Sequence, residues 1–435
     1  MFLDKDRLLM NTVFTLFWVW CSYGFISEEI VPALLSIESM ALTLVDMALL
    51  FIGIIVLKDK RDIIFVFSFL VVGYYITCVH NHNSLLYFIN GLRDFIYIIA
   101  IIPIIRYLYN SRLKEEFVQK FDKHLLIFLV VQAICITFQF VKYGANDHGG
   151  GSMGNGYSGI VSMMIYLISF YLMRKRIDPN DYVGSLIANK WLLILLMPTF
   201  LNETKISFIF FAFYFILLMP IDKKSLVKYI VMIPLLLLLM SGVFSVYLSA
   251  TGNKDDITSL DYYIDEYLIA SEDNDILLWA EYLYDHGEIE ADGSADVPRF
   301  TKYLLLPEIN EEYPGHDITG YGIGQFKGGT SIEYSKFYKD NEWMLRGSMP
   351  YGYHAYIQIG LFAILFFVWF WVRVYSFRKK GNPSDISVQV YIWIQVLLVL
   401  FYNDFFRYSF MVLIMVYVMS QALRGDYMKP QEIEK

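Results

Sequence analysis

Residues 39–57 read SMALTLVDMALLFIGIIVL, and this stretch decides the class of fold. It carries one ionisable residue, Asp46, among predominantly apolar side chains. About 20 consecutive apolar residues are enough for a helix to cross the hydrocarbon core of a bilayer. The stretch therefore predicts a membrane-spanning helix, and the rest of the chain can be compared with it.

The whole chain is also rich in apolar residues. Its 435 residues are 57% hydrophobic and 18% charged, with a mean hydropathy of +0.46. A soluble domain carries about 25% charged residues, so a soluble enzyme and a disordered chain are both excluded. The net charge of −8 argues against a nucleic-acid partner. The three cysteines lie in apolar runs and show neither a disulfide framework nor metal-ligand spacing, so we expect no metal and no cofactor.

Eleven further apolar runs resemble the first. Together they predict an all-α polytopic membrane protein with about twelve transmembrane helices and one large, mostly helical outer loop. The twelve runs lie near residues 8–26, 39–57, 63–79, 85–105, 124–141, 157–173, 190–201, 206–220, 227–249, 351–372, 386–402 and 408–423.

Lysine and arginine predict the orientation. If the N-terminus is cytoplasmic, every inner segment is cationic, whereas the short outer segments hold only Lys142, Lys205 and Arg407. Both termini are therefore expected on the cytoplasmic side. The predicted division is residues 1–250 with helices 1–9, residues 251–350 as an outward-facing loop domain, and residues 351–435 with helices 10–12.

The long outer segment has its own character. In residues 251–350, Asp and Glu outnumber Lys and Arg by 21 to 7, and tyrosine and tryptophan are frequent. Thr330 with Glu333 can form a capping box, and Asp296 with Pro298 is typical of a helix start. We expect a small helical cap on the outer surface of the membrane domain.

Several cations lie where an ionisable group is expensive. Arg93 lies roughly 12 Å below the outer end of its run, where a charge needs a partner or water. A structural pair of Arg93 with Asp94 or Asp46 is the simpler interpretation. Lys205 lies between two short runs, in a turn that is expected to be recessed and to face an outward cavity, unless the lysine snorkels to the interface. The same argument applies to Arg407, which can instead pair with Asp404.

His354 begins the tenth run, and Gln358 lies one turn further on the same helical face. Two glycine-rich stretches accompany it. Residues 149–156, before the sixth run, form either a flexible turn or a loop whose amides could meet an anion. Residues 320–326, GYGIGQF, follow no predicted strand, which excludes a dinucleotide-binding motif and favours a tight, packed turn.

Taken in order, these outer elements form a pattern. Arg299 begins a short helix, the GYGIGQF turn follows, and His354 opens a membrane helix with Gly360 six residues on. This arrangement resembles the O-antigen ligase and O-antigen polymerase (Wzy) superfamily. Two positions depart from that family's pattern: His354 is followed by Ala355 instead of asparagine, and Lys205 stands where arginine is usual.

The resemblance implies a metal-independent glycosyltransferase in the bacterial cytoplasmic (inner) membrane, with its active site on the outer side. It implies transfer of a growing glycan from undecaprenyl diphosphate onto an undecaprenyl-diphosphate-linked repeat unit, with a chain-length regulator as a separate partner. His354 would be the catalytic base. The diphosphate would be bound by Arg299, Lys205 and Arg93. Other residues that could contact the substrate are Tyr321, Gln325, Tyr353, Gln358 and Arg407.

Two alternatives stay open. An O-antigen ligase would use the same chemistry with lipid A–core as acceptor. A polysaccharide or lipid transporter, such as a flippase, would also place twelve helices with both ends inside. The absence of visible repeat halves and the structured outer segment favour the enzyme over the transporter.

Overall fold

A computed structural model describes residues 4–144, 149–178, 181–201, 206–218, 299, 301–326, 334–345 and 349–427. Within these ranges the chain is helical and has no strand, only an isolated antiparallel bridge between Asp178 and Asp181. The ninth predicted run, the capping box at 330–333 and most of residues 251–350 lie outside the described residues, as does the turn at 202–205.

Four helical stretches are long and apolar enough to cross a membrane. They are Lys5–Ile30, Pro32–Val56, Lys60–His80 and Lys114–Tyr143. Three bent helix pairs raise the number to seven if each pair counts as one span. The fold is thus that of an all-α protein with four to seven candidate membrane spans, and the predicted count of twelve is not reproduced among the described residues.

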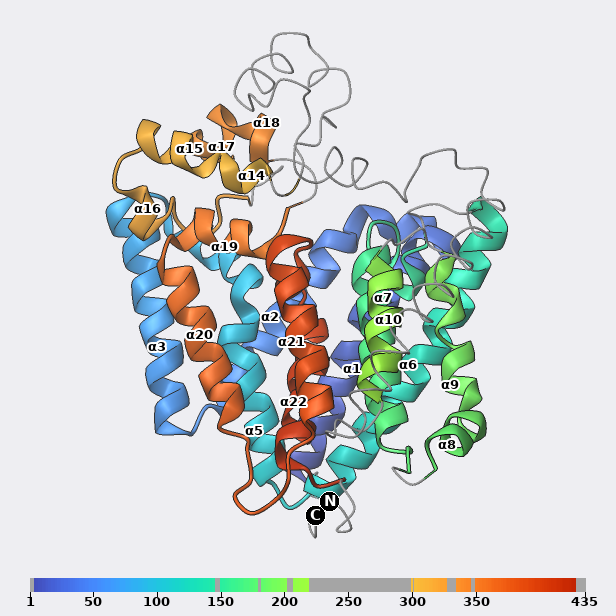
Figure 1. Ribbon diagram of the computed structural model, residues 1–435. Coiled ribbons are helices and arrows are strands. Elements are labelled where there is room, and N and C mark those ends of the chain that lie inside the picture. The colour runs from blue at the N-terminus through green and yellow to red at the C-terminus, as the bar shows by residue number, and fades with distance from the viewer. Residues whose placement is uncertain are drawn as a thin grey trace.

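The helices form one bundle (Figure 1). Its main helices are α1 (Lys5–Phe25), α2 (Glu38–Val56), α3 (Lys60–Tyr74), α4 (Leu85–Gly91), α5 (Ile102–Asn110), α6 (Lys114–Tyr143), α7 (Ser158–Arg174), α8 (Tyr182–Ala188), α9 (Lys190–Ile194), α10 (Ile206–Leu218), α19 (Tyr351–Ile359), α20 (Phe362–Tyr375), α21 (Ile386–Phe401) and α22 (Ser409–Arg424).

Burial separates inner helices from outer ones. Nearly every side chain of α7 and α22 is buried, so these two helices form the centre of the bundle. By contrast, α2, α3 and α20 expose large apolar side chains such as Phe51, Phe67 and Val368. A helix that is apolar all round and buried belongs to a core, whereas an apolar face open to the surroundings suits contact with lipid.

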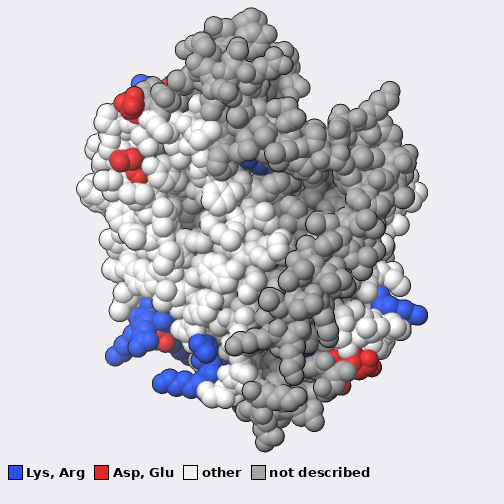
Figure 2. All heavy atoms as spheres, in the orientation of Figure 1, with Lys and Arg blue, Asp and Glu red and all other residues white. Residues whose placement is uncertain are grey.

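The two ends of the bundle differ. The first and last described segments meet at one end, where Asp4 pairs with Arg112 at 2.9 Å and Asp426 with Lys114 at 3.4 Å. We call this the terminal end. On the face drawn in Figure 2, most of the described Lys and Arg side chains gather there.

The opposite end carries a layer of short helices, which we call the cap (Figure 1). Its buried side chains include Leu305, Ile309, Tyr321 and Phe337, which form a hydrophobic cluster of their own. The described part of the predicted loop domain is therefore helical. The cap helices are α14 (Thr301–Leu304), α15 (Leu306–Glu312), α16 (His316–Thr319), α17 (Lys336–Asp340) and α18 (Glu342–Leu345).

The tenth run is not one helix, and this prediction was wrong. Helices α19 and α20 meet at an angle of 119°. Gly360 lies at the bend with φ of +56°, a left-handed conformation that suits glycine because it has no Cβ. A Cβ at Gly360 would also lie 2.4 Å from the carbonyl oxygen of Ile318 in the cap. The bend turns α19 beneath the cap and brings His354 with it.

Replacing Gly360 by alanine should therefore destabilise the protein by about 2–3 kcal/mol, through the left-handed backbone and the close contact together. Gly381 is a matched control, because its φ is also positive at +88° but a Cβ there meets no atom within 4 Å. Unfolding of both variants in mild detergent measures the difference. Equal losses at the two positions would show that the bend does not depend on close packing against the cap.

Candidate functional site

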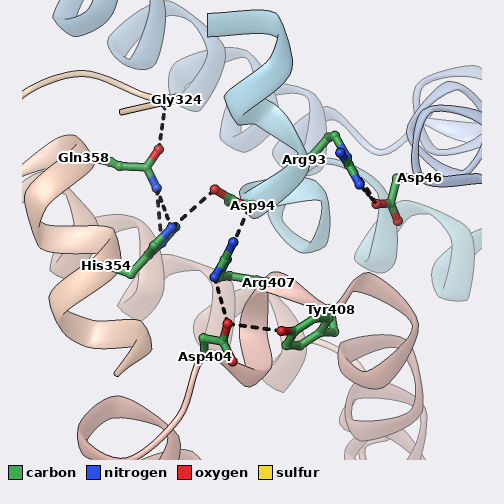
Figure 3. A network of polar contacts seen from close by, with 9 residues as sticks. All are labelled: Asp46, Arg93, Asp94, Gly324, His354, Gln358, Asp404, Arg407 and Tyr408. Carbon is green, nitrogen blue, oxygen red and sulfur yellow. Dashed lines mark hydrogen bonds and ion pairs between the residues drawn. The ribbon is translucent and has the colours of Figure 1, made fainter. Parts of the chain in front are cut away.

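Three short helical segments bring polar side chains together under the cap. One is the short 3-10 helix η4 (Leu92–Phe95), which interrupts the helical run between α4 and the π-helix η5 (Tyr97–Ile101). The others are α19 and the 3-10 helix η8 (Phe405–Arg407), between α21 and α22. Figure 3 shows that Arg93 and Asp94, neighbours on η4, point in different directions. Each of them joins a different set of partners.

His354 is almost fully enclosed, with 1% of its side chain exposed. Its Nε2 lies 3.3 Å from Oδ2 of Asp94, and its Nδ1 lies 3.1 Å from the amide nitrogen of Gln358. The amide oxygen of Gln358 accepts from the backbone N–H of Gly324 at 2.7 Å, so its nitrogen is the atom that faces the ring. Phe326 stacks over the imidazole, with 4.5 Å between ring centroids.

Both ring nitrogens have polar neighbours. The amide nitrogen of Gln358 lies 3.1 Å from Nδ1 and 3.3 Å from Nε2 of His354. The carboxylate of Asp94 approaches the ring on the side of Nε2, at 3.3 Å. A neutral imidazole has one basic nitrogen, so His354 can accept a proton while these two neighbours hold the ring in place.

Asp94 also connects the histidine to Arg407 (Figure 3). Nε of Arg407 lies 3.4 Å from Oδ1 of Asp94, and Nη1 lies 2.8 Å from Asp404. Tyr408 donates its hydroxyl to the same Asp404 carboxylate at 3.2 Å. Arg407 exposes 27% of its side chain, whereas Asp94 exposes 3%. A ligand that enters from the surface thus meets the guanidinium before the central carboxylate.

Arg93 forms a second, neighbouring pair. Its Nη2 lies 3.2 Å from Oδ2 of Asp46 on α2, and Ser409 donates to the other oxygen of Asp46 at 3.1 Å. The structural pair that the sequence suggested for Arg93 and Asp46 is present. So is the pair of Arg407 with Asp404. Arg93 retains 18% exposure of its side chain, so the pair leaves part of its guanidinium accessible.

The GYGIGQF segment is the packed turn that the sequence predicts. Backbone amides of Tyr321 and Gly322 donate to Ile357 and Gln358 of α19, at 2.8 and 2.9 Å. Gly324 lies against α4 so closely that a Cβ on Gly91 would be 2.3 Å from its nitrogen. The turn therefore packs between α19 and the end of α4. It places the ring of Phe326 over His354 and the amide of Gly324 against the side chain of Gln358.

The remaining described residues that the sequence predicts for the site lie at different places around this cluster. Arg299 places its guanidinium over the ring of Tyr402, 4.3 Å from the centroid, next to the segment that carries Arg407. Tyr353 is fully buried, and its hydroxyl has no hydrogen-bond partner among the described residues; the same holds for Oε1 of Gln325. Tyr321 stacks on Phe337 within the cap at 3.7 Å. Lys205 lies outside the described residues.

The glycine-rich stretch at 149–156 is a packed turn with its amides occupied. The amide of Gly151 donates to Gln139 at 2.8 Å, and that of Ser152 donates to Gln132 at 2.8 Å. The amide of Asn155 donates to the Glu28 carboxylate at 2.9 Å. Side chains of α6 and of the segment that follows α1 thus hold the amides that an anion would need, and the anion-loop interpretation of these three amides is not supported.

Sequence reasoning underestimated Asp94, which joins His354 to Arg407. No local signal could identify it, because its partners lie some 260 and 313 residues away. The spacing of Asp404, Arg407 and Tyr408 was a usable signal, since residues three and four apart meet on one side of a turn. Lys302, fully buried in the cap, was also not anticipated. Among the described residues, no group of three or more His, Cys, Asp or Glu side chains is placed to hold a metal ion.

No family model matches this chain, and no curated protein matches it in sequence. A functional conclusion therefore depends on the cluster itself, together with the resemblance of the sequence pattern.

Proposed function

We propose that this protein is a polysaccharide polymerase that joins glycans carried on undecaprenyl diphosphate. One observation supports it most strongly: a buried histidine, His354, is held between the carboxylate of Asp94 and the amide of Gln358, beside the partly exposed guanidinium of Arg407. A general base next to a cation is what glycosyl transfer from a diphosphate requires. The sequence pattern shared with the polymerase and ligase superfamily adds the substrate class.

In the proposed reaction, a hydroxyl of the acceptor sugar replaces the Gln358 amide beside the imidazole of His354 and donates its proton to the basic ring nitrogen. The hydroxyl oxygen forms a bond to the anomeric carbon of the donor glycan. The bond from that carbon to the diphosphate oxygen breaks, and the diphosphate leaves on its lipid. Phe326 covers the imidazole in this conformation, so its ring must shift before the hydroxyl arrives.

The cations of the site would stabilise the leaving diphosphate. Negative charge grows on the leaving diphosphate as the glycosidic bond breaks, and fixed cations that stabilise this charge lower the barrier. Arginine suits the task because its fork matches phosphate oxygens. Arg407, Arg93 and Arg299 are the described candidates, and Lys205 is a fourth from outside the described residues. The carboxylates that hold Arg407 and Arg93 keep both guanidiniums in place before substrate binds.

The proposal also places the protein in a membrane and gives its orientation there. The chain would reside in the bacterial cytoplasmic membrane with its termini inside and its cap outside. The gathering of Lys and Arg at the terminal end in Figure 2 supports this orientation, because cytoplasmic loops carry an excess of basic residues. The polymerase would work with a separate chain-length regulator.

Substitutions at Arg299 test the diphosphate role. Alanine should lower polymer formation by about 100-fold, the scale expected for a cation that stabilises the leaving group. Lysine should keep partial activity, because it retains the charge but loses the fork. Polymer ladders made by membranes that contain equal amounts of each variant measure the effect. Full activity in both variants would remove Arg299 from the proposed site.

Two other functions remain as alternatives. A ligase would transfer the glycan to lipid A–core with the same residues, so only the acceptor separates the two enzymes. A flippase would not need His354 as a base and would translocate lipid-linked glycan without making a glycosidic bond. Translocation that survives loss of His354, with no new bond formed, would favour the flippase.

A further inference from the structure

A second polar site lies at the terminal end, on the opposite side of the bundle from His354. A cavity of about 640 Å³ opens there between the start of α1, the connection from α2 to α3 and the end of α5. Its polar lining includes Asp6, Lys58, Arg106 and Arg112. None of these residues takes part in the proposed reaction, so the cavity needs an explanation of its own.

The floor of the cavity is an internally balanced charge cluster. Asp62 forms ion pairs with Arg106 and with Arg373, each at 2.6 Å. Arg373 forms a further ion pair with Asp59 at 3.1 Å. Two guanidiniums thus meet two carboxylates, and most of this cluster is buried. Such a cluster fixes the start of α3 and the ends of α5 and α20 relative to one another, and it leaves little net charge to attract a ligand.

The wall of the cavity is different. Lys58 places its ammonium over the ring of Tyr107, 5.1 Å from the centroid, and no carboxylate of the described residues lies within ion-pair distance of it. Asp6 accepts the hydroxyl of the same Tyr107 at 2.5 Å and has no cation within ion-pair distance in the described part of the chain. One cation and one anion, neither in an ion pair within the described part of the chain, therefore flank one tyrosine in the cavity. Arg112 also lines the cavity; it pairs with Asp4 at 2.9 Å but leaves 73% of its side chain exposed.

The surroundings indicate what kind of molecule reaches this wall. Ile54 and Ile55 at the end of α2, and Ile63 and Ile64 at the start of α3, are 41–57% exposed beside the cavity. These apolar faces continue along the candidate membrane spans. A ligand with a polar head and acyl chains can place its head in the cavity and its chains along α2 and α3.

We propose that this cavity binds the head group of an aminophospholipid, of the phosphatidylethanolamine class. The phosphate pairs with Lys58 and Arg112, and the primary ammonium pairs with Asp6. Phosphatidylglycerol lacks the ammonium, and its net charge is opposed by Asp6. The quaternary ammonium of phosphatidylcholine cannot donate a hydrogen bond to that carboxylate. The site therefore discriminates by head group, and this inference is independent of the proposed polymerase activity.

Lipid binding to the purified full-length protein tests the proposal. Native mass spectrometry counts retained lipid during titration with phosphatidylethanolamine, phosphatidylglycerol or phosphatidylcholine of matched acyl chains. We expect the wild type to bind phosphatidylethanolamine about tenfold more tightly than the other two, which corresponds to one charge-assisted contact. Lys58→Gln should weaken binding of all three lipids by about tenfold, because each carries the phosphate.

Asp6→Asn should remove the preference for phosphatidylethanolamine and leave phosphatidylglycerol bound at least as well as before. Lys60→Gln and Glu115→Gln are controls, because both positions are exposed and neither lines the cavity. Equal affinity of the wild type for the three lipids, unchanged affinity in Lys58→Gln, or unchanged preference in Asp6→Asn would overturn the proposal. Competition by free glycerophosphoethanolamine at the same concentration as the lipid would also overturn it, since the ligand would then be a soluble phosphoamine.

Discussion

Replacing His354 by alanine should lower polymer formation by at least about 100-fold, the usual contribution of a general base. The protein should still reach the membrane. Removal of the imidazole eliminates the only proposed proton acceptor for the acceptor hydroxyl, while the fold keeps its other contacts. Polymer made per unit of membrane-embedded protein is the quantity to measure.

Two comparisons make the result specific to the chemistry. His80 is exposed at the same end of the bundle, and His80→Ala should leave activity unchanged. Asp94→Asn keeps the shape of the site but removes the charge that holds the imidazole; we expect about a tenfold loss and an altered pH profile. Normal chain length in the His354→Ala protein would contradict the catalytic assignment.

Replacing Arg407 by alanine should have the largest combined effect. It leaves Asp94 and Asp404 without their shared guanidinium, and loss of one partner from a largely enclosed ion pair costs about 3 kcal/mol. We place the cost at the lower end of the usual range because 27% of the Arg407 side chain is exposed. Activity should fall by about 100-fold beyond the loss of folded protein, because a cation near the leaving group disappears.

A double substitution separates the two effects. Arg407→Ala combined with Asp94→Asn removes one of the two carboxylate charges that lose the guanidinium, so stability measured by unfolding in detergent should recover in part while activity stays low. Arg378→Ala is the control, since Arg378 is exposed at the terminal end. Recovery of activity together with stability in the double variant would mean that Arg407 only balances Asp94.

Local features of the sequence predicted much of the fold. Long apolar runs such as 39–57 correspond to α2 and its counterparts, because helix formation and membrane insertion both depend on composition over about 20 residues. The ion pairs of Arg93 with Asp46 and of Arg407 with Asp404 could also be predicted from the sequence, since a buried charge needs a partner. The GYGIGQF turn followed from glycine spacing.

Other features depend on contacts that no local pattern carries. The 119° bend between α19 and α20 was missed, although Gly360 is visible in the sequence, because a glycine in an apolar run is also compatible with a straight helix. The link from Asp94 to His354 joins two elements far apart in the chain. The occupied amides of Gly151 and Ser152 depend on two glutamines of α6, which from sequence alone resemble ordinary polar positions in a helix.

The central claim is that this protein joins lipid-linked repeat units, and one measurement tests it most directly. The purified protein in nanodiscs receives only undecaprenyl-diphosphate-linked repeat units, and the products are separated by size. The proposal predicts a ladder of polymer that is absent with the His354→Ala variant. No product from repeat units alone, with transfer appearing once lipid A–core is added, would contradict the polymerase and indicate a ligase.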